Sequence, residues 1–403
     1  MMLARKKGGR MARSMRSISL ALRTTDFVRN HVMLVVAAAL AFFTMIIVPP
    51  DGAYLGYFDW NTLGCLFSVL AVANAFRFAG VFDRIARIVI ERLSTSTTVV
   101  MTLVVITGVF SMVVTNDLAL IIMLPITLYA LVKAGWGSLI APVFVLEGLA
   151  ANLCGIIMPF GNPQNLYLYF FYSIGIVDFL QTMALPFMIS AVLVIVCTFV
   201  LVRRANAQPA KIDRTGKQPL KLGRILVYLL LLVLSLLAVF RVLPVGIVAA
   251  VIFVSVALAD VRALKAVDYP LLLTFVCFFI FAGNMARMPY LGELLGGLME
   301  ADGLIASALL SQVISNVPAA VLLSHFTGSW QALLVGVNVG GAGTLVASLA
   351  SLITLRCFTR ARYLFPDFAE SRALSKRRFM KFFTYLNFGF LAVLLVVCHF
   401  QGV

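Results

Sequence analysis

Four short polar segments interrupt long apolar stretches of this sequence, and their residue types suit ion binding better than covalent chemistry. They span residues 115–117, 162–165, 315–316 and 344–348. Asparagine and serine side chains supply neutral oxygen atoms, which hard cations such as sodium prefer, and amide groups donate hydrogen bonds to oxyanions. The candidate substrate-binding residues are Asn116, Asn162, Asn165, Ser315, Asn316, Thr344 and Ser348.

The same segments contain residues that begin helices. Asn162 precedes Pro163, and Asn316 stands two positions before Pro318. Asparagine is a preferred N-cap, and proline fits the first helical turn because its missing N–H group is not needed there. The other candidate caps are Thr115 or Asn116 and Thr344 or Ser348. Four helix N-termini that meet within a membrane present N–H groups and positive dipole ends, so together they favour an anion.

Asp117 is the only charged residue between positions 97 and 132. A carboxyl at membrane depth costs about 2.5–3.5 kcal/mol on insertion scales, so it normally has a partner or a task. An ionised Asp117 would repel an arriving anion, and a bound proton or sodium ion would remove that conflict. We therefore expect neutralisation of Asp117 to couple ion movement to solute movement; the alternative is a structural helix cap.

Glu147 is a second acidic residue in an apolar stretch, five positions before Asn152. Five residues span about 7.5 Å along a helix axis. Glu147 either takes part in proton coupling or pairs with a basic residue such as Lys133. The candidate coupling-ion residues are Thr115, Asp117, Asn152, Asn338 and Glu147, and the candidate sodium ligands are Asn116, Asp117 and Asn162. Apart from a coupling Na⁺ or H⁺, no cofactor is expected.

The composition places these residues in a membrane protein. Of the 403 residues, 62% are hydrophobic and 12% are charged, whereas soluble domains have about 45–50% apolar and about 25% charged residues. The six cysteines show no C-x-x-C or Cys/His spacing, so disulfides and metal sites of that kind are not expected. Soluble enzymes, disordered proteins and disulfide scaffolds are excluded.

The apolar segments divide into ordinary membrane spans and interrupted ones. Segments of about 20 residues can cross a bilayer, and the expected spans are 31–48, 60–79, 183–202, 225–243, 244–259, 269–287 and 382–400. Residues 97–132 and 303–327 are expected to form re-entrant hairpins with tips at Thr115 and Ser315. Residues 138–173 and 329–355 are expected to form helices broken by proline and glycine. An amphipathic segment, 81–93, is expected along the interface.

The hairpin and the broken helix occur twice, which predicts two repeats. Aligning Thr115 with Ser315 gives an offset of 200 residues, and aligning Asn152 with Asn338 gives an offset of 186 residues. The fold class is therefore an all-α polytopic membrane protein with two inverted repeats. The expected regions are a basic cytoplasmic tail 1–30, a first repeat 31–202, a basic linker 203–224, a second repeat 225–358, a basic loop 359–381 and a C-terminal transmembrane helix 382–403.

The basic residues predict the orientation. The net charge is +16, and 30 of the 32 Lys and Arg residues fall in six short regions. If these regions share one side, the positive-inside rule makes them cytoplasmic, so the N-terminus is inside, the C-terminus is outside and the two hairpins enter from opposite faces. The bacterial inner membrane is the expected location, with a mitochondrial targeting segment as the alternative interpretation of the tail. Nucleic acid is not an expected partner.

The interrupted segments resemble a known superfamily of ion transporters. The resemblance lies in the motifs at 115–120, 151–152, 161–166, 311–318, 337–341 and 348–350. They are similar to the repeats of arsenite permeases, citrate transporters and divalent-anion symporters, and most similar to uncharacterised bacterial inner-membrane anion permeases. The resemblance implies a scaffold, a moving transport domain and a homodimer. The symporters carry Ser-Asn-Thr at both tips, whereas this chain has Thr-Asn-Asp and Ser-Asn-Val, which makes proton coupling, arsenite-like chemistry or antiport more plausible than sodium-coupled dicarboxylate transport.

These observations predict a secondary active transporter for a small anion, such as a carboxylate or an inorganic oxyanion, coupled to protons or sodium. The alternatives are a sodium/proton antiporter and a passive anion channel. No G-x-x-x-x-G-K-[ST] motif and no H-E-x-x-H motif occurs, so neither ATP hydrolysis nor another enzyme activity is expected.

Overall fold

The structure, a computed structural model, describes residues 31–82, 84, 95–205, 222–364 and 374–402. Within these ranges the chain forms fifteen α-helices and three short 3-10 helices, and no strand. It divides into two compact units. Unit 1 comprises Met1–Phe58 and Asp268–Met285, and unit 2 comprises Asp59–Val267 and Ala286–Val403.

Unit 1 is built on two apolar helices, α2 (Val32–Ile47) and α12 (Tyr269–Ala286), with the short helix η1 (Gly52–Tyr57) after α2. Asn284 Nδ2 of α12 donates a hydrogen bond to Thr44 Oγ1 of α2, with 3.2 Å between the atoms. Both residues are buried. A polar pair of this kind joins apolar helices because neither group has water to bond within the bilayer.

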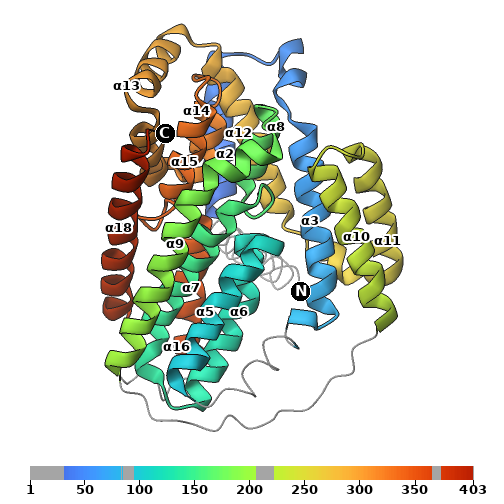
Figure 1. Cartoon of the computed structure of the whole chain (residues 1–403). Coiled ribbons are helices and arrows are strands. Elements are labelled where there is room, and N and C mark those ends of the chain that lie inside the picture. Colours follow the sequence, from blue (N-terminus) through green and yellow to red (C-terminus); the bar gives the residue numbers. More distant parts are fainter. Residues whose placement is uncertain (1–30, 83, 85–94, 206–221, 365–373, 403) are drawn as a thin grey trace, which may run out of the picture. The chain divides into compact units, whose positions relative to one another are not determined.

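Unit 2 contains a three-helix group made of α3 (Trp60–Phe78), α10 (Leu222–Val239) and α11 (Val245–Lys265), which pack against one another (Figure 1). Asp59 begins α3, and its carboxylate accepts hydrogen bonds from the N–H groups of Asn61 and Thr62. An acidic N-cap satisfies orphan donors and lies at the positive end of the helix dipole.

The segment 97–132 folds into two 18-residue helices, α5 (Ser96–Val113) and α6 (Asn116–Lys133), which pack together and are joined at Val114 and Thr115. The turn therefore lies at the predicted tip. Each helix is long and apolar enough to cross a membrane by length and composition. Re-entry of this hairpin thus stays a prediction.

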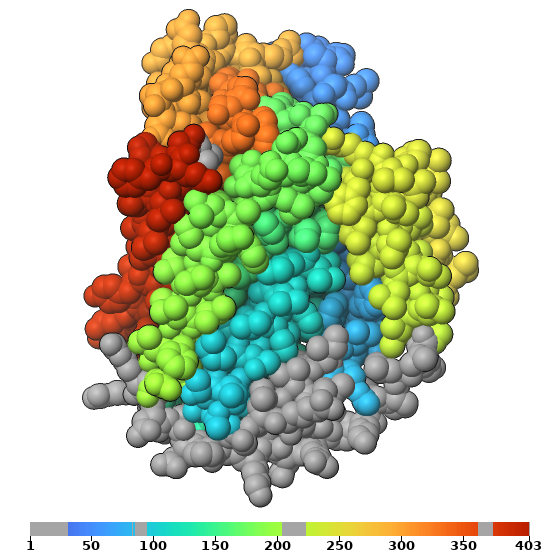
Figure 2. Space-filling view, viewed as in Figure 1, coloured from blue at the N-terminus to red at the C-terminus, as the bar shows by residue number. Residues whose placement is uncertain are grey.

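The segment 138–173 is broken as its sequence predicts. It forms α7 (Ile140–Cys154), a short turn η3 (Gly155–Ile157) and, after an irregular stretch, α8 (Pro163–Phe171). Every residue of α7 is buried. The long helix α9 (Ile176–Ala205) follows and packs against α5 and α7. Figure 2 shows α9, in light green, across the face of unit 2 that is turned to the viewer.

The second half of unit 2 contains a helix–tip–helix and a broken helix of its own. The helix α13 (Pro289–Ile314) changes direction at Asp302, whose backbone is non-helical and whose carboxylate accepts from the N–H group of Ile305. The first helix of the expected hairpin is therefore the part of α13 after Asp302, and it begins at the predicted position 303. After the tip at Ser315 comes α14 (Asn316–Leu323).

The second predicted break is also present. The helix α15 (Trp330–Val339) ends before the glycines at 340–343, and α16 (Leu349–Leu364) begins after Ser348. The last helix, α18 (Lys376–Phe400), begins before the expected position 382 and packs against α7 and α9. In Figure 1, α5 and α6 extend to the lower end of unit 2, and α13 and α14 lie toward its upper end.

The structure confirms an all-helical polytopic membrane protein. Nine helices of the described chain are long and apolar enough to cross a membrane, and each of the seven ordinary spans expected from the sequence coincides with a helix. The inverted relation of the two repeats stays a prediction. The tail 1–30, most of the linker 203–224, much of the loop 359–381 and most of the amphipathic segment 81–93 lie outside the described residues.

Candidate functional site

The two helix tips each meet a break in another helix. The N–H group of Asn116, at the first tip, donates to Gly161 O at 3.0 Å, and that of Asn316, at the second tip, donates to Ala347 O at 2.9 Å. Gly161 precedes Asn162, and Ala347 precedes Ser348. The two contacts are equivalent, because the offset of 200 residues pairs Asn116 with Asn316 and the offset of 186 residues pairs Gly161 with Ala347.

The tips differ in backbone conformation. Thr115 is the N-cap residue of α6 with φ −83°, whereas Ser315 is the N-cap residue of α14 with φ 82° and ψ 154°. A positive φ is uncommon for a residue with a side chain, and such strain costs on the order of 1–3 kcal/mol. The carboxamide oxygens of Asn116 and Asn316 both accept from the next backbone N–H group.

Hydrogen bonds between side chains connect the two breaks. Ser348 Oγ, at the start of α16, donates to Asn152 Oδ1 at the end of α7, with a distance of 3.1 Å. In the reciprocal position, Asn338 Nδ2 donates to Asn165 Oδ1 at 2.5 Å. The amide nitrogens of Gln164 and Asn162 both donate to Asn338 Oδ1. Each broken helix thus receives polar partners from the other half of the chain.

Two amide nitrogens from different halves of the chain face Gly341. A methyl carbon at Gly341 would lie 2.7 Å from Asn152 Nδ2 and 3.1 Å from Asn316 Nδ2. Within the described residues, neither nitrogen has a hydrogen-bond acceptor, although both side chains are at least 96% buried. We call these two nitrogens and Gly341 the donor site. Amide donors without an acceptor in nearly buried side chains favour a ligand that can accept hydrogen bonds.

A group of oxygen atoms faces Gly155, which the sequence alignment pairs with Gly341. A methyl carbon at Gly155 would lie 3.1 Å from Asn162 Oδ1, 3.2 Å from Ser111 O and 3.3 Å from Ser111 Oγ. Asn162 Oδ1 is buried and has no hydrogen-bond donor among the described groups. We call these three oxygens and Gly155 the oxygen site. Its chemistry suits a hard cation, which takes neutral and carbonyl oxygens as ligands.

The predicted sodium ligands are placed unequally around the oxygen site. Asn162 belongs to it, whereas Asn116 directs its carboxamide oxygen to the N–H group of Asp117. Asp117 is 9% exposed and lies in the first turn of α6. Thr115 Oγ1 is buried and has no described hydrogen-bond partner. The ligand set predicted from sequence stays a prediction.

Two predicted residues lie apart from these bonds. Thr344 is half-buried, and its N–H and hydroxyl groups both donate to Gln312, at 2.8 and 2.9 Å. Glu147 bonds to Thr107 and Thr127 rather than to an asparagine of the breaks. The suggested pairing of Glu147 with Lys133 is wrong within the described residues, because the Lys133 ammonium lies over the ring of Tyr129.

Ser111, Gln164 and Gln312 are polar residues of the site that sequence reasoning missed. Ser111 and Gln312 stand four and three positions before the two tip residues Thr115 and Ser315, within apolar helices. Gln312 Nε2 donates to Gly340 O at 2.6 Å and to Ala342 O at 3.0 Å, whereas Ser111 faces Gly155 and its hydroxyl donates to Gly108 O of its own helix. The sequence feature that could have identified Ser111 and Gln312 is a polar residue about one helical turn before each tip.

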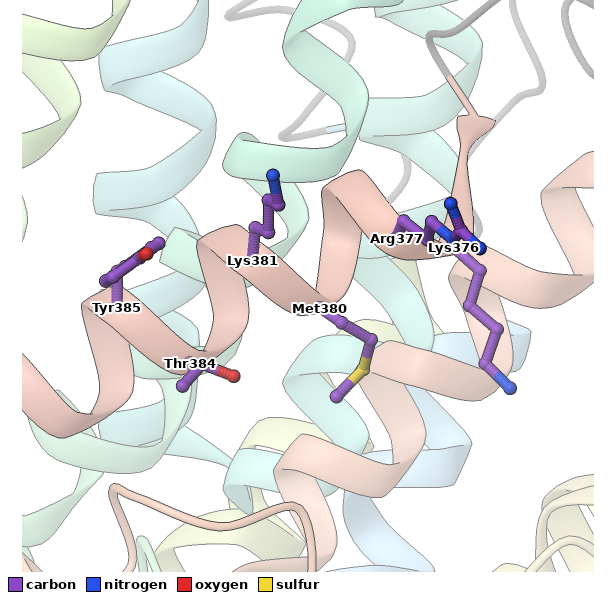
Figure 3. Close-up of a pocket in the computed structure, with 6 residues that line it drawn as sticks. All are labelled: Lys376, Arg377, Met380, Lys381, Thr384 and Tyr385. Atoms are coloured by element: carbon purple, nitrogen blue, oxygen red, sulfur yellow. The ribbon is translucent and has the colours of Figure 1, made fainter.

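A basic groove on α18 lies outside this site. It has a volume of about 580 Å³ and is lined by Lys376, Arg377, Met380, Lys381, Thr384 and Tyr385 (Figure 3). These positions repeat every three to four residues, so they form one helix face. None of them belongs to the donor site or the oxygen site, and α18 places the cations in its first two turns.

Comparison with known proteins identifies the family. A citrate transporter family model matches residues 20–329. An uncharacterised transporter of Methanocaldococcus jannaschii is 33% identical over 300 residues, covering 74% of this chain and 81% of that protein. The inner membrane protein YbiR of Escherichia coli is 31% identical over 308 residues, covering 74% and 80%. The silicon efflux transporter LSI3 of Oryza sativa is 30% identical over 135 residues, covering 33% and 27%. The chain, a multi-pass membrane protein with buried polar breaks, therefore belongs to the citrate transporter family.

Proposed function

We propose that this protein is a secondary active transporter that moves a small anion, a carboxylate or an inorganic oxyanion, across the membrane, and that it catalyses no chemical reaction. A transporter is supported by the family and by the names of the relatives. The observation that carries the choice of an anion is the donor site, where the amide nitrogens of two nearly buried asparagines lack acceptors in the described chain.

The helix ends beside the donor site add to this preference. The helix α14 begins at Asn316, whose Nδ2 belongs to the donor site. The helix α16 begins just after Ser348, whose hydroxyl donates to Asn152, the other residue of the donor site. A helix N-terminus contributes a partial positive charge, which favours an anion by about 0.3–1 kcal/mol at an exposed position. An anion bound there would accept from both halves of the chain at once.

The oxygen site provides a place for a coupling cation near the first tip. Its three oxygen atoms come from α5 and from the residue that begins α8. Binding of a cation here would join the helix pair α5–α6 to the broken helix. We accordingly propose coupling to sodium or protons, with the transporter in a bacterial inner membrane, its N-terminus cytoplasmic, its C-terminus outside and two copies forming a homodimer.

The test is solute exchange by the purified full chain in liposomes. The panel contains citrate because of the family, silicic acid because of the rice relative, and arsenite, succinate, sulfate and phosphate as small anions or their acids. We expect the wild-type protein to exchange at least one of these across the membrane and to accumulate it uphill under an imposed proton or sodium gradient. Flux that only equilibrates the solute, without uphill accumulation under either gradient, would instead indicate a channel.

The substitution Gly341→Ala tests the donor site. Its methyl group would lie 2.7 Å from Asn152 Nδ2, so we expect exchange to fall about tenfold or more, the equivalent of one lost hydrogen bond of about 1.4 kcal/mol. Gly246→Ala is the matched control, because nothing lies within 4 Å of a methyl carbon there. Equal exchange by both variants would refute the donor site. Sodium-driven proton movement that needs no panel solute would favour the antiporter.

A further inference from the structure

Glu147 is a fully buried acid outside the donor site and the oxygen site. It lies in the middle of α7, and its side chain is 0% exposed. The only hydrogen bonds of its carboxyl group within the described chain are to Thr107 of α5 and Thr127 of α6. Glu147 therefore lies where both helices of the first tip pack against the broken helix. A carboxyl at this depth normally has a task or a partner.

Two threonine hydroxyls contact one oxygen of this carboxyl group. Thr127 Oγ1 donates to Glu147 Oε1 at 2.6 Å. Thr107 Oγ1 also donates to this oxygen, at 3.2 Å, but lies only 2.8 Å from Leu103 O. A hydroxyl has one hydrogen, so Thr107 shares it between Glu147 Oε1 and the nearer Leu103 O. Thr127 is therefore the one strong donor to this carboxyl group within the described residues.

The rest of the carboxyl group agrees with a neutral acid. Glu147 Oε2 is buried and has no hydrogen-bond partner among the described groups. A carboxylate would spread its charge over both oxygens and would need several donors or a counter-ion. With Thr127 as its one strong donor within the described residues, an ionised Glu147 would be poorly stabilised in this apolar helix.

No described basic side chain forms an ion pair with Glu147. Among the elements that pack against α7, the helix α5, the helix α15 and the turns η2 (Gly137–Leu139) and η3 carry no titratable side chain. The titratable groups described on the remaining neighbours are Asp117, Tyr129 and Lys133 of α6, Asp178, Cys197 and Arg203 of α9, Arg356, Cys357 and Arg360 of α16, and Lys376, Arg377, Arg378, Lys381, Tyr385, Cys398 and His399 of α18.

None of these groups forms a hydrogen bond or an ion pair with Glu147 within the described residues. Phe144 and Phe358 pack edge to face one helical turn away on α7 and α16. The surroundings of Glu147 are thus apolar apart from the two threonines.

We propose that Glu147 holds a proton at neutral pH and that this proton is the coupling ion of the transporter. This inference rests on the proposed transport function. Glu147 is five residues from Asn152 on the same helix, about 7.5 Å along its axis, so α7 links the proton to the donor site. When α5 and α6 separate from α7, the O–H bond of the carboxyl group breaks, the proton passes to water, and the carboxylate takes a proton from water on the other side.

Infrared spectroscopy of the full chain in liposomes tests the proton directly and needs no solute. At neutral pH, the wild-type protein should show the carbonyl stretching band of a buried, protonated carboxyl group, and Glu147→Gln should remove it. Glu300→Gln is the matched control, because Glu300 is exposed, and it should leave the band in place. A spectrum of Glu147→Gln that retains every protonated-carboxyl band of the wild type would overturn the proposal.

The threonines give a second spectroscopic test. Thr127→Val removes the donor to Glu147 Oε1, so the band should move to a higher frequency as the carbonyl loses a hydrogen bond. Thr102→Val is its control on α5, because the Thr102 hydroxyl bonds to Thr98 O of its own helix and to no other group among the described residues. A band that does not move in Thr127→Val would show that the protonated group is not Glu147.

Solute flux tests the coupling. For each panel solute that the wild type exchanges, Glu147→Gln should lower the ratio of pH-driven accumulation to exchange at least tenfold, whereas Glu300→Gln should not change it. An unchanged ratio would overturn the coupling role. Loss of both fluxes in folded Glu147→Gln protein would also count against it, because glutamine resembles the protonated acid. If the wild type exchanges none of the panel, the proposed function fails, and the infrared result still decides the protonation.

Discussion

At the scale of single residues, the two tips are unequal although they occupy matching positions. Ser315 has φ 82°, whereas Thr115 has φ −83°. Residues held in such conformations cluster at ligand sites and switch regions, where the neighbouring structure maintains them. In this chain the N–H group of the next residue, Asn316, bonds to Ala347 O and holds the second tip against its break.

We expect Ser315→Gly to stabilise the protein. Glycine relieves strain on the order of 1–3 kcal/mol and loses about 0.5–1 kcal/mol through the greater freedom of the unfolded chain, so the net gain should be about 1 kcal/mol. Thr115→Gly, at the unstrained tip, should lower stability by about 0.5–1 kcal/mol. Thermal unfolding midpoints of the two purified variants measure the difference. Midpoints that fall equally would show that Ser315 carries no strain.

At the scale of helices, Arg241 binds backbone carbonyl groups at the C-terminal end of α8. Its guanidinium donates to Tyr169 O and to Ile174 O, and it lies 4.5 Å from the centre of the Tyr169 ring. The contacts favour a structural role, since a cation that bonds the last carbonyls of a helix also complements its dipole.

We expect Arg241→Lys to destabilise the protein by about 1–2 kcal/mol. A lysine ammonium cannot reproduce the planar fork that bonds two carbonyls and stacks on an aromatic ring. Arg203→Lys is the control: Arg203 also lies 4.5 Å from a ring centre, that of Phe199, but bonds no described carbonyl. Both variants would be compared by thermal unfolding midpoint, and an equal effect would show that the carbonyl contacts contribute nothing.

At the scale of the whole molecule, the orientation predicted from charge can be tested with two matched substitutions. Ser138, which follows α6, and Ser329, which follows α14, are both exposed. If the two hairpins enter from opposite faces, Ser329 faces the outside and Ser138 faces the cytoplasm.

In a background with the six native cysteines replaced, we expect an impermeant maleimide to label Ser329→Cys in intact cells. Ser138→Cys should react only after the membrane is permeabilised. Labelling of both positions from the same side would contradict inverted topology. The test does not depend on the donor site or the oxygen site.

The sequence predicted the local features of this molecule well. Proline and glycine act through their own backbone, so the breaks near Pro163 and Gly341 and the tips at Thr115 and Ser315 could be located. The ion pair that the sequence offered as one alternative for Glu147 is not formed within the described residues, where its carboxyl group bonds Thr107 and Thr127. Likewise, no single stretch of sequence indicates that Asn338 bonds Asn165, 173 residues away. Contacts of this kind depend on how helices pack, which local patterns do not determine.

The exchanged hydrogen bonds between the breaks have an evolutionary consequence. Asn152 is bonded by Ser348, and Asn338 is bonded by Gln164 and Asn165. If an ancestral gene was duplicated, each copy has since specialised as the complement of its sister. A protein made of two identical repeats would lack these complementary side chains at its breaks. When the two repeats are coexpressed as separate fragments, we therefore expect the first to assemble with the second and not with another copy of itself.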